Sequence, residues 1–68
     1  MEIAPGATLC GLVNVGINGF VGAGATVLPR VQIGSDAIIG AGAVVTRNVE
    51  KGQTVVGVPA KPLKDFWI

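Results

Sequence analysis

The segment Val21-Gly22-Ala23-Gly24-Ala25-Thr26 decides how this chain folds, because close copies of it stand at equal distances before it and after it in the sequence. The earlier copy begins at Ile3 and reads Ile-Ala-Pro-Gly-Ala-Thr, and the later copy begins at Ile39 and reads Ile-Gly-Ala-Gly-Ala-Val. In each copy a branched aliphatic residue stands first and a small residue stands fifth. Repetition at a fixed period is typical of solenoid proteins.

A shorter, six-residue pattern runs through most of the chain. Its first position is always a branched aliphatic residue: Ile3, Leu9, Val15, Val21, Val27, Ile33, Ile39 and Val45. An α-helix does not explain this pattern, since six is far from a multiple of 3.6 residues per turn. Inside a unit such as Ala25-Thr26-Val27-Leu28 the alternation has the period of a half-buried strand. The pattern therefore predicts short strands joined by turns.

The 18-residue spacing makes three units one coil, so that each strand pairs with its copy in the next coil. Small apolar residues of successive coils then stack, as in the predicted column Val13, Val31 and Val49. The pattern stops at Lys51, which falls on an expected core position, and Pro59 and Pro62 prevent a regular continuation. We therefore predict an all-β fold, a parallel β-helix of about three 18-residue coils over residues 1–58, followed by a C-terminal tail over residues 59–68. The apolar tail residues are expected to cover the end of the prism or to dock on a neighbour; they are Leu63, Phe66, Trp67 and Ile68.

Composition and charge exclude several classes of function. The net charge of +1 predicts neither a nucleic-acid partner nor a membrane partner. The single cysteine, Cys10, excludes an internal disulfide bond and is typical of a cytoplasmic protein. The apolar runs are too short to span a bilayer, and the first residues lack the features of a signal peptide. The chain has no histidine, so neither a thiol activated by histidine nor a zinc site built from histidines is expected.

The repeats resemble the left-handed parallel β-helix of the hexapeptide-repeat acyltransferases. The run from Ile39 to Thr46 matches their repeats, and Val56-Gly57-Val58-Pro59-Ala60-Lys61 matches the closing motif of many members. The closest subgroup is that of the sialic-acid and bacillosamine type of sugar O- and N-acetyltransferases, of which this chain resembles the C-terminal part. The resemblance implies a left-handed coil, a homotrimer, and acetyl-CoA lying in a groove between two subunits.

The resemblance also implies catalytic histidines that this chain does not contain. In the family a histidine from an earlier coil acts as general base, and a second one precedes the stretch that matches Ile3 to Ala7. The second position is Glu2 here, a carboxylate at the chain terminus. We therefore expect no catalytic residue in this chain, and an acyltransferase-like, truncated form that is inactive alone.

The cofactor contacts implied by the resemblance map onto four residues. Ala23 and Ala41 match positions whose backbone meets the pantetheine arm, where small side chains let a thin ligand come close. Gly11 matches a position near the acetyl end, and Lys61 is expected to meet the nucleotide phosphates, with Lys64 a weaker candidate. The alternative is that alanine and glycine simply suit tight corners and that the lysines are ordinary solvated charges.

Two functions stay open on these residues. The first is an acetyl-CoA-dependent, sugar acyltransferase-like protein that keeps a CoA groove; the second is a structural or assembly module without a ligand. Outward apolar residues predict self-association as a homotrimer; they are Phe20, Leu28 and Ile38. The first coil has little charge to protect its strand edges, which predicts that two trimers stack through their N-terminal coils into a hexamer.

Overall fold

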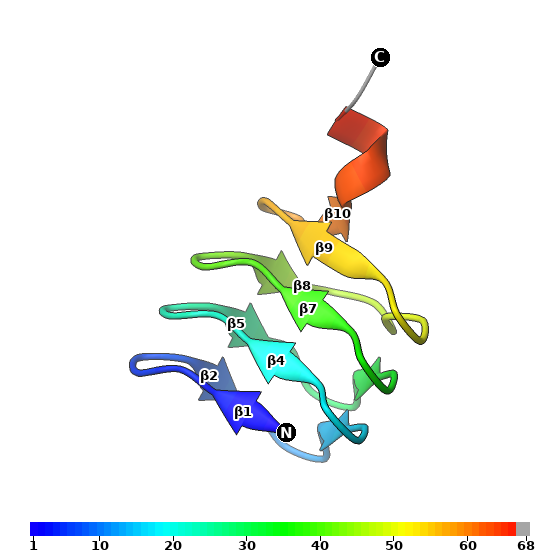
Figure 1. Ribbon diagram of the computed structural model, residues 1–68. Coiled ribbons are helices and arrows are strands. Elements are labelled where there is room, and N and C mark those ends of the chain that lie inside the picture. The colour runs from blue at the N-terminus through cyan, green and yellow to red at the C-terminus, as the bar shows by residue number, and fades with distance from the viewer. Residues whose placement is uncertain (67–68) are drawn as a thin grey trace.

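Short strands, mostly of two residues, wind into a triangular prism in the computed structural model, which describes residues 1–66 (Figure 1). The strands are β1 (Glu2–Ile3), β2 (Thr8–Leu9), β3 (Asn14–Val15), β4 (Phe20–Val21), β5 (Thr26–Val27), β6 (Gln32–Ile33), β7 (Ile38–Ile39), β8 (Val44–Val45), β9 (Thr54–Val56) and β10 (Lys61–Pro62). A short 3-10 helix, η1 (Leu63–Phe66), follows them. Three coils account for β1 to β8 and β9 begins a fourth, which confirms the predicted all-β solenoid of about three coils.

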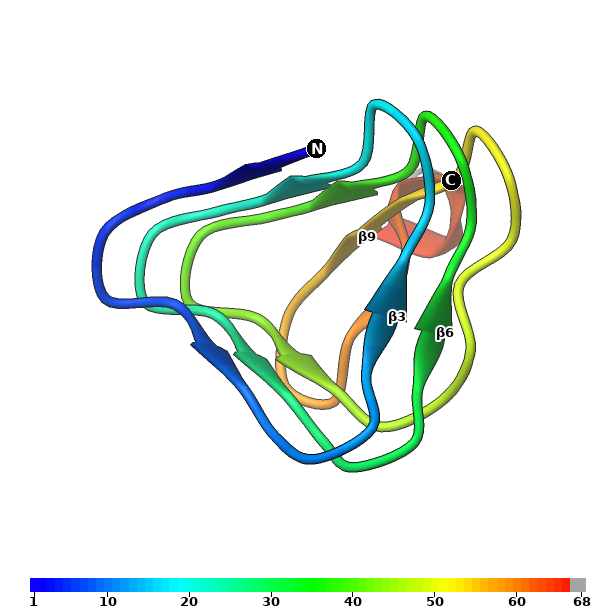
Figure 2. The ribbon, with the colours of Figure 1, turned by 90° about the horizontal axis from the view of Figure 1, so that it is seen from below.

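Each side of the prism is one parallel sheet. The first face holds β1, β4, β7 and β9, the second holds β2, β5 and β8, and the third holds β3 and β6. We call the turns after these faces the first corner (4–7, 22–25, 40–43), the second corner (10–13, 28–31, 46–48) and the third corner (16–19, 34–37, 50–53). Figure 2 looks along the axis from the N-terminal end, and the chain turns anticlockwise as it recedes, so the coil is left-handed as predicted.

The register between coils matches the sequence repeat in the first two coils and falls short of it toward the C-terminal end of the prism. Ile3 pairs with Val21, and Val21 pairs with Ile39, as the repeat requires. After β8 the paired residues are 16 apart in the sequence and no longer 18, because Val49 is bridged to Ile33 and Val55 pairs with Ile39. The third coil is therefore two residues shorter than predicted, and the shortening lies at its second corner.

Two sequence expectations are wrong for this reason. Val49 does not continue the column of Val13 and Val31, because it stands beside Ile33 instead. Lys51 is not at a core position, because the shortened coil moves it into an exposed turn at the third corner. Val49 still reaches the core from its new register and is only 5% exposed.

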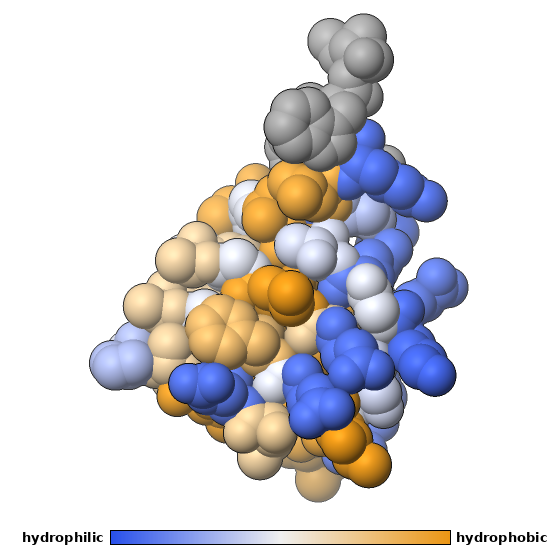
Figure 3. All heavy atoms as spheres, in the orientation of Figure 1, coloured by the Kyte–Doolittle hydropathy of each residue, from blue (hydrophilic) through white to orange (hydrophobic). Residues whose placement is uncertain are grey.

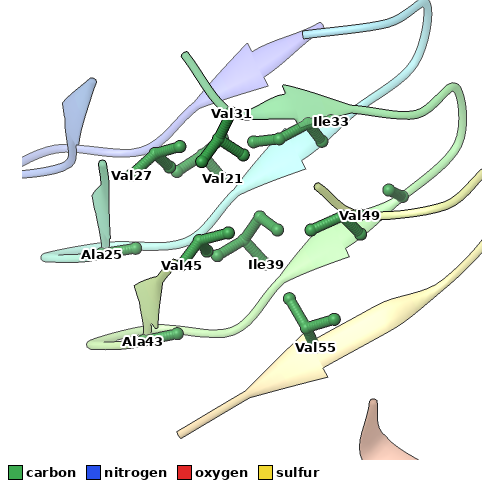
Figure 4. Close-up of a cluster of buried hydrophobic side chains, with 11 residues drawn as sticks. Val21, Ala25, Val27, Val31, Ile33, Ile39, Ala43, Val45, Val49 and Val55 are labelled. Carbon is green, nitrogen blue, oxygen red and sulfur yellow. The ribbon is translucent and has the colours of Figure 1, made fainter. Parts of the chain in front are cut away.

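The core is a column of aliphatic side chains along the axis of the prism. Figure 4 shows them pointing inward from all three faces. The buried members are Val21, Ala25, Val27, Val31, Ile33, Ala37, Ile39, Ala43, Val45, Val49 and Val55. Burying one such valine or isoleucine side chain contributes roughly 1.5–3 kcal/mol. No polar or charged residue is buried in the described part of the chain. The first and fifth positions of the six-residue pattern supply this core, as predicted.

The turns at the corners share one backbone conformation. The third residue of nearly every turn has a positive φ, between 61° and 79°, in the left-handed region. These residues are Gly6, Leu12, Asn18, Gly24, Arg30, Asp36, Gly42 and Gly52. The shortened corner between Val45 and Val49 contains no such residue. Its geometry therefore differs from that of every corner above it.

Leu12→Asn is expected to raise the free energy of unfolding by about 0.5–1 kcal/mol. Leu12 has φ 62° and is 75% exposed, and asparagine tolerates the left-handed region better than leucine does. Urea denaturation followed by circular dichroism measures the change. The control is Ile17→Asn, because Ile17 is 77% exposed and has no positive φ. An equal gain in both variants would show that loss of an exposed apolar side chain, and not backbone strain, is responsible.

The chain reverses after β9 and covers the C-terminal end of the prism. Residues 57–60 form a turn, and β10 runs antiparallel to β9, with Lys61 beside Val56 and Pro62 beside Val55. Ala60 packs against the core, and its N–H donates to Val44 O at 2.8 Å. The prediction that the apolar side chains from Phe66 to Ile68 cover this end falls outside the side chains that the structure describes.

Candidate functional site

The first corner presents an edge that is almost free of side chains. Ala23 and Ala41 stand at the same turn position in successive coils, about 4.8 Å apart by strand spacing. Both are exposed, as are Gly24 and Gly42, and no atom lies within 4 Å of the place where a Cβ would stand on either glycine. We call these four residues the alanine edge. Its side chains extend no further than a methyl group, so a thin ligand can approach the backbone.

Hydrogen bonds between coils hold the alanine edge in place. The N–H of Gly42 donates to Ala23 O at 2.9 Å, and the N–H of Gly24 donates to Pro5 O at 3.3 Å. These turns are therefore hydrogen-bonded to the preceding coil, as the strands are. The structure brings Ala23 and Ala41 together as the sequence predicted, on a rigid part of the fold.

Gly11 lies at a different corner from the alanine edge. It follows β2 at the second corner, where its carbonyl oxygen accepts a hydrogen bond from the N–H of Arg30 at 2.9 Å. Figure 2 shows the first and second corners at separate vertices of the triangular outline. Six residues in near-extended conformation separate them, roughly 15–20 Å of chain. The structure therefore does not bring Gly11 to Ala23 and Ala41 within one chain.

Lys61 lies at the C-terminal end of the prism, close to the lower end of the second corner. It lines a surface pocket of about 250 Å³ together with Thr46, Arg47, Pro59, Ala60 and Pro62. Lys64 lines another pocket, of about 400 Å³, with residues that include Gln53, Thr54 and Leu63. The two lysines therefore do not share a site.

Arg47 is a candidate residue that the sequence reasoning missed. It follows β8 as Gly11 follows β2, and it lines the pocket of Lys61. Arg30 stands one coil above it at the same corner, so three of the chain's five cationic side chains gather along this side. All three are exposed. We call Gly11, Arg30, Arg47 and Lys61 the cationic edge. The recurrence of arginine after β5 and after β8 is the sequence signal that indicates it.

The polar residues with reactive side chains are not arranged as a catalytic pair. Glu2 lies exposed in β1 on the first face, where its N–H donates to Gly19 O at 2.8 Å. Cys10 is half-buried at the second corner. Among the side chains that the structure describes, there is no group of histidine, cysteine, aspartate or glutamate residues that could hold a metal ion. The described side chains thus offer two edges suited to binding, and they include no acid–base arrangement.

Comparisons with known proteins agree on one family. The sequence pattern described as bacterial transferase hexapeptide (six repeats) matches residues 13–47. The acetyltransferase domain of PglB from Neisseria gonorrhoeae FA1090 is 43% identical with a TM-score of 0.88, covering 90% of this chain and 30% of that one, and it has also been solved with acetyl coenzyme A. PerB from Caulobacter crescentus, solved with CoA and GDP-perosamine, is 47% identical with a TM-score of 0.87, covering 88% and 29%.

Other comparisons extend this result or limit it. WeeI from Acinetobacter baumannii AYE is 41% identical with a TM-score of 0.86, covering 90% of this chain and 31% of that one. The chain therefore spans about 30% of the length of the solved chains it matches. No curated protein sequence gives a match. Within the described residues, no helix has the length and apolar character needed to cross a membrane. The six-residue repeats, the left-handed coil and these matches agree, and the chain belongs to the bacterial transferase hexapeptide family.

Proposed function

We propose that this chain supplies the CoA-binding coils of a sugar acetyltransferase and that it does not transfer acetyl groups alone. The observation that carries the proposal is the alanine edge, where backbone is exposed over two coils and no side chain extends beyond a methyl group. Neighbours that are 43–47% identical have been solved with acetyl coenzyme A or CoA. When bound, acetyl-CoA supplies the acetyl group as a thioester. Because CoA thioesters are used in the cytoplasm, the proposal places the chain there.

The alanine edge suits the thin pantetheine arm, and the cationic edge suits the phosphates. Ala23 and Ala41 leave room for an extended chain, as their methyl groups and the neighbouring glycines create no obstruction. Lys61 and Arg47 approach one pocket from different elements, and paired cationic side chains favour a phosphate group there. Gly11 lies at the upper end of the same edge and is proposed to lie near the acetyl end.

Two copies of the chain are needed to bring the two edges together. Within one chain the edges stand at separate corners (Figure 2). We propose a homotrimer in which the alanine edge of one copy faces the cationic edge of the next. Figure 3 shows hydrophobic side chains gathered over the first face, which borders the alanine edge. Phe20 and Ile38 point outward from that face, and Leu28, at the second corner, is 36% exposed. Contact between these two apolar surfaces closes into a ring under threefold symmetry.

Catalysis needs a general base beside the reacting groups, and the histidine that most often fills this role does not occur in these 68 residues. Attack by a sugar amine or hydroxyl on a thioester requires a base within hydrogen-bond reach of the nucleophile. The chain has no histidine, and Glu2 is exposed with no partner side chain among its hydrogen bonds. We therefore propose that the chain binds and orients the cofactor, whereas the general base comes from elsewhere.

Titration calorimetry with CoA is the direct test. The chain is expected to bind CoA, and Ala23→Glu is expected to weaken binding at least tenfold, because a carboxylate fills the edge and repels the phosphates. Ser35→Glu is the matched control, since Ser35 holds the same turn position in the same coil at the third corner. It adds the same charge away from both edges and should leave the affinity unchanged.

Three different experimental results would each contradict one part of the proposal. Absence of heat at millimolar CoA would favour a structural or assembly module without a ligand. Equal weakening by Ala23→Glu and Ser35→Glu would remove the alanine edge from the site. Acetyl transfer to an amino sugar above the background rate would contradict the absence of turnover.

A further inference from the structure

At the shortened corner of the third coil, a side chain accepts a hydrogen bond that the backbone accepts in the other coils. In the regular coils, N–H groups on the strands donate to carbonyl oxygens of the next coil, as Asn14 N–H does to Val31 O at 3.1 Å. The N–H of Gln32 points toward the third coil in the same way. There it donates to the side-chain Oδ1 of Asn48, at 2.8 Å. Asn48 thus supplies the acceptor that the two missing residues would have carried.

The backbone that follows Asn48 is hydrogen-bonded to β6 and to the residue after it. The N–H of Val49 donates to Gln32 O at 2.9 Å, and the N–H of Gly34 donates to Val49 O at 2.8 Å. The side chain of Asn48 and the backbone of Val49 both form hydrogen bonds with Gln32 of β6. These bonds fix the position at which the short corner after Val45 ends. Arg47 is the residue immediately before this anchor, and its side chain is exposed.

Arg47 stands between two pockets with different chemistry. One is the pocket that it shares with Lys61. The other, of about 230 Å³ at the C-terminal end of the core, is also lined by Arg47, together with Asn48, Val49 and Glu50. A free arginine at this place has a carboxylate on one side and a lysine on the other, and a carboxylate is its better partner. Arg47 can bind an anion beside Lys61 only if its side chain is kept from pairing with Glu50.

We propose that Asn48 is a positioning residue for cofactor binding: its hydrogen bond to Gln32 N–H holds the shortened corner so that Arg47 faces the pocket of Lys61. The inference rests on the proposed function, since it takes the nucleotide phosphates of CoA as the anion. Asn48 does not touch the ligand itself. It acts through Arg47, and this distinguishes it from a residue that only stabilises the fold.

A double-mutant cycle on CoA affinity tests this role. Arg47→Gln is expected to weaken CoA binding about tenfold, as loss of one charge-assisted contact does. Asn48→Ala is expected to weaken it by about fivefold, and the double variant is expected to be no weaker than Arg47→Gln alone. Residues that act through one another give such non-additive effects, whereas independent effects multiply to about fiftyfold. Multiplied effects in the double variant would overturn the proposal.

A second variant separates positioning from stability. Inserting Gly-Val between Arg47 and Asn48 rebuilds the regular corner, in which Arg30 and Val31 hold these two positions in the second coil. The main chain then supplies the acceptor for Gln32, so the variant is expected to melt at or above the temperature of the unmodified chain. It is expected to bind CoA as weakly as Arg47→Gln does.

The outcomes distinguish this inference from the proposed function. A folded insertion variant with unmodified CoA affinity overturns the role of Asn48 and leaves CoA binding intact. Failure of the unmodified chain to bind CoA overturns the proposed function and this inference with it. The non-additive cycle together with weak binding by a stable insertion variant supports the proposal.

Discussion

Gly22→Ala is expected to lower the free energy of unfolding by about 3 kcal/mol, which is most of the stability of a chain of this size. A Cβ at this position would lie 2.6 Å from Ala41 N, 2.7 Å from Ile39 O and 2.9 Å from Ala41 Cα. All three atoms belong to the backbone of the next coil and cannot rotate away. One methyl group therefore forces two coils apart where their strands are hydrogen-bonded.

Gly11→Ala is the matched control for this substitution. No atom lies within 4 Å of its Cβ position, and Gly11 has no positive φ. The expected change is within about 0.5 kcal/mol, as at an ordinary surface site. Urea denaturation of both variants, followed by circular dichroism, measures the difference. Similar losses at both positions would mean that glycine contributes through the flexibility of the unfolded chain and that coil spacing does not decide the cost.

The sequence predicts the first two coils well because one physical requirement repeats there. Stacked coils place equivalent residues against each other, so each inward position must suit its neighbours above and below. Ile39, which is fully buried, pairs with Val21 above it and Val55 below it. A pattern that recurs once per coil therefore reports both the core and the strand pairing.

Counting repeats fails at the third coil, because a side chain can replace a peptide group. Asn48 accepts the hydrogen bond that a backbone carbonyl would accept in a regular coil. The corner can then be two residues shorter without leaving the N–H of Gln32 unpaired. After this corner the six-residue pattern is displaced by two residues. Lys51 looked like the end of the repeats for this reason, although Val55 returns to the core shortly after it.

The candidate site was predictable where it depends on the repeat and unpredictable where it depends on the tail. Ala23 and Ala41 are one full repeat apart, so their place on one edge follows from the coil length. Gly11 precedes Ala23 by two of the six-residue units, and three units make a coil, so that spacing already assigns it to another corner. The pocket of Arg47 and Lys61 forms only because β10 turns back along β9, and no repeat encodes that reversal.

Ile38→Lys is expected to convert the proposed trimer into monomers, lowering the mass in light scattering from three times 6.8 kDa to 6.8 kDa. Ile38 is 44% exposed on the first face, over which hydrophobic side chains gather (Figure 3). Burying an unpaired lysine in each of three identical contacts costs several kcal/mol per contact, which exceeds what an interface of this size supplies. CoA affinity is expected to fall in parallel, because the alanine edge and the cationic edge of the groove then no longer face each other.

Ile17→Lys is the matched control, since Ile17 is 77% exposed at the third corner, outside the first face and outside both edges of the groove. It carries the same added charge and is expected to remain trimeric and to bind CoA with unchanged affinity. Ile38→Lys that still sediments and scatters as a trimer would remove the first face from the interface. A monomeric Ile38→Lys variant that binds CoA as tightly as the unmodified chain would contradict the shared groove, because one chain would then hold the cofactor on its own edge. Loss of both trimer and binding in Ile38→Lys alone is the result that requires residues from two copies at each site.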